Sequence, residues 1–157
     1  MDWVKAMPAR GDVLFGTAVS CSDGDGFGLA SEAGRVRIRL VWIDAPEMNQ
    51  PYGGEARRAL WGLLSGIGLR VEVKGHDKYG RSLGLVVRDD GVVVNLRMIE
   101  IGAAHYYAKF GHGWTSMREA EASARGERRG LWALAHVHRP WDWRRQDNYH
   151  VRVCGVK

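Results

Sequence analysis

Apolar residues alternate with arginines from position 35 to position 40, and Val41 and Trp42 follow. Apolar residues occupy the even positions from Val36 to Trp42, and arginines occupy odd positions from Arg35 to Arg39. A period of two places successive side chains on opposite faces of a β-strand. We therefore expect a strand through Trp42 with one buried apolar face and with Arg39 on the polar face. The proline at position 46 closes this run.

Three other regions have the composition or the period of strands. Residues 13–21 mix small and β-branched residues, and residues 69–74 alternate apolar with charged ones. Residues 83–87 and 92–94 are apolar runs joined through Asp90-Gly91, a dipeptide that tolerates the positive φ angles of a tight turn. This pattern predicts a hairpin.

Three segments are predicted to be helical. Apolar residues recur at helical spacing from Ala56 to Ile67 and are followed by a glycine at position 68. Asn95 is a candidate N-cap for a short second helix. Ser116 and Glu119 have the spacing of a capping box at the start of a third helix. The order of strands, a helix, further strands and two helices predicts an α+β fold. Periodicity is compatible with both a barrel and an open sheet.

Length and charge narrow the class of protein. The 157 residues fit a single domain, with a core at about 12–133 and a tail rich in Trp and Arg at 134–157. The formal net charge of +5 favours a polyanionic partner, although solubility alone also explains such a value. No membrane-spanning stretch and no secretory signal is visible, which leaves the compartment unknown. Cys21 and Cys154 are compatible with a disulfide or with two thiols.

Acidic residues cluster in three predicted turns. These are Asp23-Gly24-Asp25-Gly26, Asp44-Ala45-Pro46-Glu47 and Asp77-Lys78-Tyr79-Gly80-Arg81. Each turn alone has ordinary turn composition. In combination, aspartates on separate turns can bind calcium, a longer carboxylate can accept a proton from water, and guanidinium groups suit phosphoryl oxygens. The combination favours metal-assisted phosphodiester chemistry.

The order and spacing of these motifs resemble the staphylococcal (thermo)nuclease domain, the family of micrococcal nuclease homologues. The resemblance runs from about residue 13 to residue 132. Its matching pieces are Asp23-Gly24-Asp25, Arg39-Leu40, residues 43–47, Tyr52-Gly53, residues 77–81, Val94-Asn95, residues 102–104 and Gly130-Leu131-Trp132. It implies an OB-fold five-stranded β-barrel with three helices. The segment at 140–144 also resembles the tail of many bacterial members.

The resemblance implies a role for each matching position. The calcium ligands correspond to Asp25, Asp44 and the backbone oxygen of Ala45, the general base to Glu47, and the phosphate-binding arginines to Arg39 and Arg81. The implied activity is calcium-dependent hydrolysis of single- and double-stranded DNA and of RNA, with little sequence preference. Water attacks phosphorus, the 5′ oxygen leaves, and 3′-phosphate ends remain. Members are often secreted or periplasmic in bacteria, and a monomer without membrane association is expected.

Some positions depart from the family pattern or match it loosely. Gly26 replaces the usual threonine, which removes a hydroxyl beside the metal and loosens the backbone. Lys78 and Tyr79 are expected along the nucleotide site, because ssDNA-binding proteins combine cations with aromatic platforms. Tyr107 falls near the family's base-stacking tyrosine, with core packing as an equal alternative. Trp141 and the second tryptophan of the tail are expected to pack that tail against the body of the protein.

Two other functions compete with a nuclease. A catalytically weakened OB-fold module could bind nucleic acid or protein without cleaving it. A regulatory domain could contact a partner through its Trp-rich tail. The joint presence of both aspartates, the glutamate and both arginines favours the nuclease, because a binding scaffold needs no such set.

Overall fold

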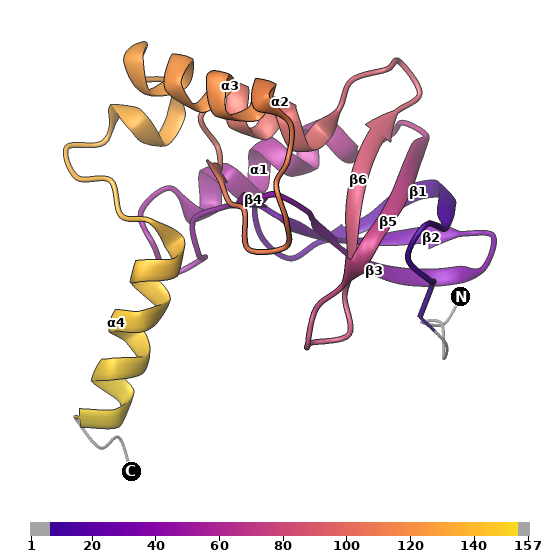
Figure 1. Cartoon of the computed structure of the whole chain (residues 1–157), viewed down its shortest axis with the longest axis horizontal. Helices are drawn as coiled ribbons and strands as arrows, with labels where there is room; N and C mark the ends of the chain where they lie inside the picture. Colours follow the sequence, from indigo (N-terminus) through magenta and orange to yellow (C-terminus); the bar gives the residue numbers. More distant parts are fainter. Residues whose placement is uncertain (1–6, 154–157) are drawn as a thin grey trace.

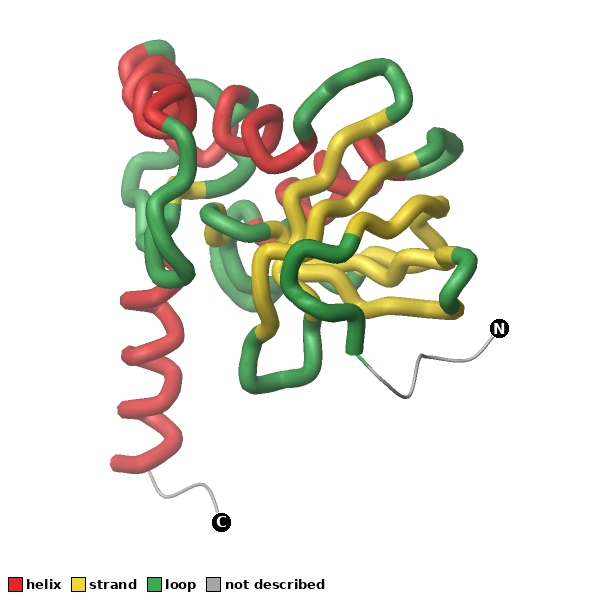
Figure 2. Tube along the Cα trace, turned by 45° about the vertical axis from the view of Figure 1, so that its right-hand side comes forward, coloured by secondary structure: helices red, strands yellow, loops and turns green. Residues whose placement is uncertain are grey.

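Five strands form a closed barrel in the computed structural model, which describes residues 7–153 and the side chains up to residue 148. Around the barrel the order is β1-β2-β3-β6-β5, with β3 and β6 parallel and the other neighbours antiparallel (Figure 2). The strands are β1 (Val13–Cys21), β2 (Gly26–Ser31), β3 (Gly34–Leu40), β5 (Leu69–His76) and β6 (Ser82–Arg88). The expected five-stranded barrel and the α+β class are confirmed.

Helices α1, α2 and α3 lie together beside the barrel (Figure 1). Their bounds are α1 (Gly53–Leu64), α2 (Val94–Glu100) and α3 (Thr115–Gly126). The short 3-10 helix η1 (Gly130–Ala133) leads to α4 (Pro140–Val153), which extends away from the other helices (Figure 1). The three expected helices are present, and α4 is a further one that periodicity did not predict. Within residues 7–153, no helix has the length and apolarity to cross a bilayer.

The strand expected to continue through Trp42 is interrupted. β3 ends at Leu40, and Trp42 has a φ angle of 67°, so the chain turns sharply there. Residues 43–44 form a separate strand, β4 (Ile43–Asp44), which pairs with β7 (His105–Tyr106). Trp42 is apolar like the buried residues of β3, so it fitted the pattern. Its ring instead packs against the distant ring of Trp114, at 6.2 Å between centroids.

The predicted hairpin after β6 is half correct. Gly91 has a φ angle of 85°, as the tight turn requires. Val93 then forms an isolated bridge with Val87, but Val94 already begins α2. The second apolar run therefore supplies the first turn of a helix and no strand.

Both predicted helix caps are wrong. Val93 is the N-cap of α2, and the buried side chain of Asn95 reaches into the barrel instead. Its Oδ1 accepts a hydrogen bond from the Val86 amide at 2.9 Å, and its Nδ2 donates to the carbonyls of Val41 and Gly84 at 2.9 and 3.0 Å. The α3 helix begins one residue before the predicted N-cap Ser116, and no described side chain caps it by a hydrogen bond.

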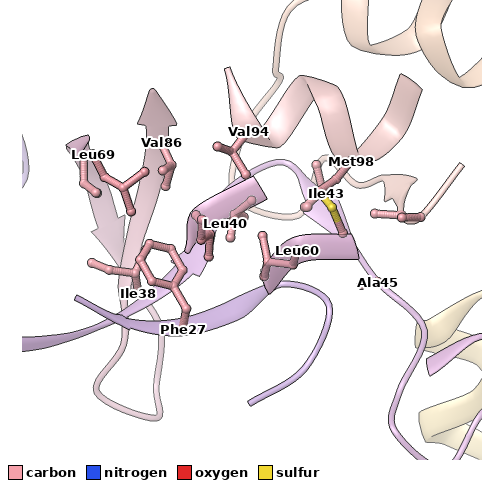
Figure 3. Packing of buried hydrophobic residues seen from close by; sticks show 14 of the residues in the cluster. Phe27, Ile38, Leu40, Ile43, Ala45, Leu60, Leu69, Val86, Val94 and Met98 are labelled. Carbon is pink, nitrogen blue, oxygen red and sulfur yellow. The ribbon is translucent and has the colours of Figure 1, made fainter. Parts of the chain in front are cut away.

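The main hydrophobic core lies between the barrel and the helices (Figure 3). Leu40 from β3, Leu60 from α1 and Met98 from α2 are fully buried in it. Phe27 from β2 packs into the same cluster, although β2 was not predicted. This core fixes the end of β3, from which the chain leads directly to Asp44.

Candidate active site

The three acidic turns converge on one cleft of about 690 Å³. Every side chain predicted to belong to the site lines this cleft: Asp25, Arg39, Asp44, Glu47, Lys78, Tyr79, Arg81 and Tyr107. The turns are far apart in sequence, and the barrel brings them together because each one follows or joins its strands. The predicted side chains therefore lie around one cleft, while their chemical roles stay predictions.

The first and second turns are locked to each other by hydrogen bonds. The Ala45 amide donates to Asp25 Oδ2 at 2.9 Å, and the Leu40 amide donates to the Asp25 carbonyl at 2.8 Å. Gly24 permits this approach, because a Cβ there would lie 2.7 Å from Ala45 Cβ and 2.8 Å from Ala56 Cβ. The Asp25 carboxylate is thereby held beside the backbone of Ala45.

Arg39 lies between the two aspartates predicted as metal ligands. Its Nη2 is 3.8 Å from Asp25 Oδ2 and 3.5 Å from Asp44 Oδ1, and all three side chains are less than 10% exposed. Its Nη1 donates to the Leu40 carbonyl at 2.9 Å, which fixes the guanidinium plane. A charged donor restrained in this way needs little reorganisation when an anion arrives.

The acidic side of the cleft is crowded with carboxylates. Burial raises the pKa of Asp44 to about 6, against the lowering effect of its arginine partners. Burial, together with the neighbouring charge of Asp25, raises the pKa of Asp23 to about 7. Asp23 lines the cleft and was not predicted as a site residue, since a turn aspartate gives no sign in sequence that it will be buried. Raised carboxylate pKa values of this kind are typical of sites that bind an additional positive charge.

The third turn presents Arg81 through an ion pair with Asp77. Arg81 Nε donates to Asp77 Oδ2 at 2.6 Å, and its amide donates to Asp77 Oδ1 at 3.0 Å. Burial alone would raise the pKa of Asp77, but the hydrogen bonds from Arg81 outweigh burial and lower it. Asp77 is therefore ionised at neutral pH and fixes the Arg81 side chain at the cleft. Tyr79, on the same turn, is 64% exposed.

A third arginine, Arg144 of α4, reaches the acidic group and was not predicted. Its Nη2 and Nη1 lie 2.7 and 3.1 Å from the two oxygens of Asp44, and Nη1 lies 2.5 Å from Glu47 Oε1. Burial lowers the pKa of Arg144, but hydrogen bonds to Asp44 and Glu47 raise it overall, so the guanidinium stays charged. The available signal was the resemblance of residues 140–144 to the tail of bacterial family members, a segment that had been expected only to pack.

The tail packs as expected and also contributes to the cleft. The Trp141 ring stacks on Tyr107 with centroids 4.9 Å apart and an interplanar angle of 13°, and both rings line the cleft. Trp143 Nε1 donates to Asn49 Oδ1 at 3.0 Å, which ties α4 to the chain that follows Glu47. Tyr107 is therefore a cleft residue covered on one face by Trp141.

The residues present fit a hard cation. Asp25 and Asp44 offer carboxylate oxygens beside the Ala45 backbone, and calcium prefers such all-oxygen sets. In the described part of the chain, no three His, Cys, Asp or Glu side chains surround one metal position. The remaining ligands would be backbone oxygen and water. A Cβ at Gly26 would lie 2.9 Å from Ser22 Oγ and 3.0 Å from an Asp23 oxygen, so glycine leaves room for both.

Comparison with known proteins finds related sequences over most of the chain. The family model for staphylococcal nuclease homologues matches residues 37–134. Protein ParB of Escherichia coli is 38% identical over 154 residues, which cover 92% of this chain and 86% of ParB. An uncharacterized endonuclease of Escherichia coli O157:H7 is 37% identical over 131 residues, covering 83% of this chain and 85% of the relative. The micrococcal nuclease of Shigella flexneri is 34% identical over 151 residues, covering 90% and 86%.

Proposed function

Because this chain belongs to the staphylococcal nuclease homologue family and is a nuclease of that type, we propose that it hydrolyses DNA and RNA with the help of calcium. Cleavage is largely independent of sequence, acts on single and double strands, and leaves 3′-phosphate ends. We further propose that the chain forms one nuclease domain and acts as a monomer.

The observation that carries this proposal is the position of Arg39. It lies within 4 Å of both Asp25 and Asp44, in a cleft that Glu47 and Arg81 also line. A buried arginine between two aspartates, in a cleft that a second arginine also lines, is an arrangement suited to a phosphodiester and a divalent cation together.

The predicted site residues then divide the reaction between them. Asp25, Asp44 and the backbone oxygen of Ala45 would hold the calcium ion. When bound, calcium supplies positive charge that stabilises the developing charge on the phosphoryl oxygens. Glu47 accepts a proton from the water whose oxygen attacks phosphorus, and the bond from phosphorus to the 5′ oxygen breaks.

The arginines and the aromatic side chains act on the substrate. Arg39 and Arg81 donate hydrogen bonds to the phosphoryl oxygens, which carry the most charge in the transition state. Lys78 and Tyr79 from one side and Tyr107 from the other contact the strand that carries the scissile bond. Stacking on tyrosine rings accepts any base, which accounts for the low sequence preference.

The test is a cleavage assay on single-stranded DNA, double-stranded DNA and RNA, with calcium and then with a chelator. We expect cleavage that stops on chelation, products with 3′-phosphate ends, and loss of cleavage in Glu47→Gln, which keeps the shape of the side chain and removes the base. Cleavage that persists in chelator contradicts the metal mechanism, and 5′-phosphate ends contradict the assigned leaving group.

A binding module without catalysis is the second candidate, and two observations favour it. Gly26 stands where the family usually has threonine, and Arg144 covers the carboxylates of Asp44 and Glu47. Intact substrate in calcium, with nucleic acid still bound, would support this candidate over the nuclease.

A further inference from the structure

One face of α4 forms a wall of the cleft. Trp141, Arg144, Arg145 and Asn148 all line it, and they occupy positions i, i+3, i+4 and i+7 of the helix. Residues at this spacing lie on one side of an α-helix. Lys78 and Tyr79, on the turn between β5 and β6, line the same cleft. This turn and α4 extend in the same direction from the barrel (Figure 1).

The chemistry of this α4 face suits a nucleic acid strand. It combines an indole ring, two guanidinium groups and a carboxamide, and aromatic rings interleaved with cations are what single strands bind. The Arg145 side chain is 80% exposed, and its Nη1 lies 3.9 Å from Asp142 Oδ1, a long distance for an ion pair. Little free energy therefore holds Arg145 away from an incoming phosphate.

Arg144 forms ion pairs with the carboxylates that are proposed to bind calcium and activate water. Its guanidinium contacts both oxygens of Asp44 and one of Glu47. Two cations that share the same carboxylate oxygens repel each other strongly in a partly buried site. Binding of calcium at Asp44 would therefore displace the guanidinium, while the backbone of Arg144 would stay on the wall of the cleft.

We propose that the α4 face is a second substrate-binding wall, on which Arg144, once displaced from Asp44, contacts a backbone phosphate of the bound strand. This inference rests on the proposed function. In the free protein the same guanidinium pairs with Asp44 and Glu47, and in the complex it contacts the substrate instead. Arg145 and Trp141 extend the contact to the neighbouring nucleotide.

The salt dependence of binding tests this role directly. Each phosphate contact to a single strand contributes about −0.7 to the slope of log affinity against log salt. We expect Arg144→Gln, compared in a Glu47→Gln background at saturating calcium, to make the slope shallower by about 0.7. The affinity for a short single-stranded oligonucleotide should fall by roughly tenfold, as the loss of one charge-assisted hydrogen bond implies. Arg145→Gln, an exposed change that leaves the fold intact, should add a further shallowing.

A charge-matched control separates this contact from a general loss of positive charge. Arg97 lies on α2, pairs with Glu100 and lines a different hollow of the surface, so Arg97→Gln should leave the slope unchanged. Arg144→Lys should keep the slope, because the charge remains, and shows that the position tolerates substitution.

An unchanged slope in Arg144→Gln overturns the proposal. If that variant also binds calcium more tightly, Arg144 is only a competitor of the metal. Cleavage by the parent protein is measured separately. A parent that binds the oligonucleotide without cleaving it refutes the proposed function, and the slopes still decide whether α4 contacts the strand.

Discussion

Replacement of Asn95 by alanine tests how the barrel holds the segment that leads to the site. The Asn95 side chain is fully buried and bonds three backbone groups, those of Val86, Val41 and Gly84. The Gly84 carbonyl keeps a second partner, the Val41 amide at 3.0 Å, whereas the Val86 amide and the Val41 carbonyl lose the bond that the side chain provides. A buried backbone group left without a partner costs about 1–3 kcal/mol, so Asn95→Ala should cost about 2–6 kcal/mol. The loss of an ordinary N-cap would cost only about 1 kcal/mol.

Urea unfolding followed by tryptophan fluorescence measures this cost, and Asn95→Asp provides a matched comparison. Aspartate is as good an N-cap as asparagine, so a capping role would leave this variant stable. At the position observed, however, the carboxylate would face the carbonyls of Val41 and Gly84 without a proton to donate, and a buried charge would be added. We expect Asn95→Asp to be at least as destabilised as Asn95→Ala. A cost near 1 kcal/mol for alanine, with no cost for aspartate, would refute the assigned hydrogen bonds.

Three further predictions concern the site. Arg39→Lys keeps the charge but loses the forked donors, so kcat/KM should fall by roughly a hundredfold in the cleavage assay, and parental activity would contradict its role. A Cβ at Gly53 would lie 2.0 Å from the Glu47 carbonyl, so Gly53→Ala should displace Glu47 and reduce kcat. Gly62→Ala in the same helix meets no atom within 4 Å and should be harmless or stabilising by about 1 kcal/mol in thermal unfolding. Burial raises the pKa of Asp44 to about 6, so between about pH 4 and pH 6 the folded protein holds a proton that the unfolded chain has released. The stability that this proton contributes to the folded state is lost as the pH rises through that range. Calcium replaces that proton, so it should raise Tm more at pH 8 than at pH 5, and equal shifts would contradict binding at this carboxylate.

Local patterns in the sequence predicted most of the strands. Alternation over residues 35–40 and 69–74 identified β3 and the first part of β5, because one face of each strand packs on the core. β2 escaped prediction because almost all of its residues, Gly26–Ser31, are buried, so no polar face alternates with the apolar one. The break at Trp42 and the role of Asn95 depend on contacts with distant segments, which a local pattern does not contain.

The site was predictable to the extent that its parts lie in turns with recognisable order and spacing. All the predicted side chains line one cleft because the barrel joins their turns. Asp23 was missed because a turn aspartate gives no sign of its burial, and Arg144 was missed for a different reason. The approach of α4 to the cleft requires Trp141 to stack on Tyr107 and Trp143 to bond Asn49, contacts between residues widely separated along the chain.

The α4 helix follows the barrel in sequence and lies outside residues 37–134, the segment that the family model matches. It is joined to the barrel by one connection and takes no part in strand pairing (Figure 1). Its place at the cleft therefore depends on side-chain contacts, such as those of Trp141 with Tyr107 and of Arg144 with Asp44. A change confined to α4 would then alter the surroundings of Asp44 while the pairing of the barrel strands stays as it is.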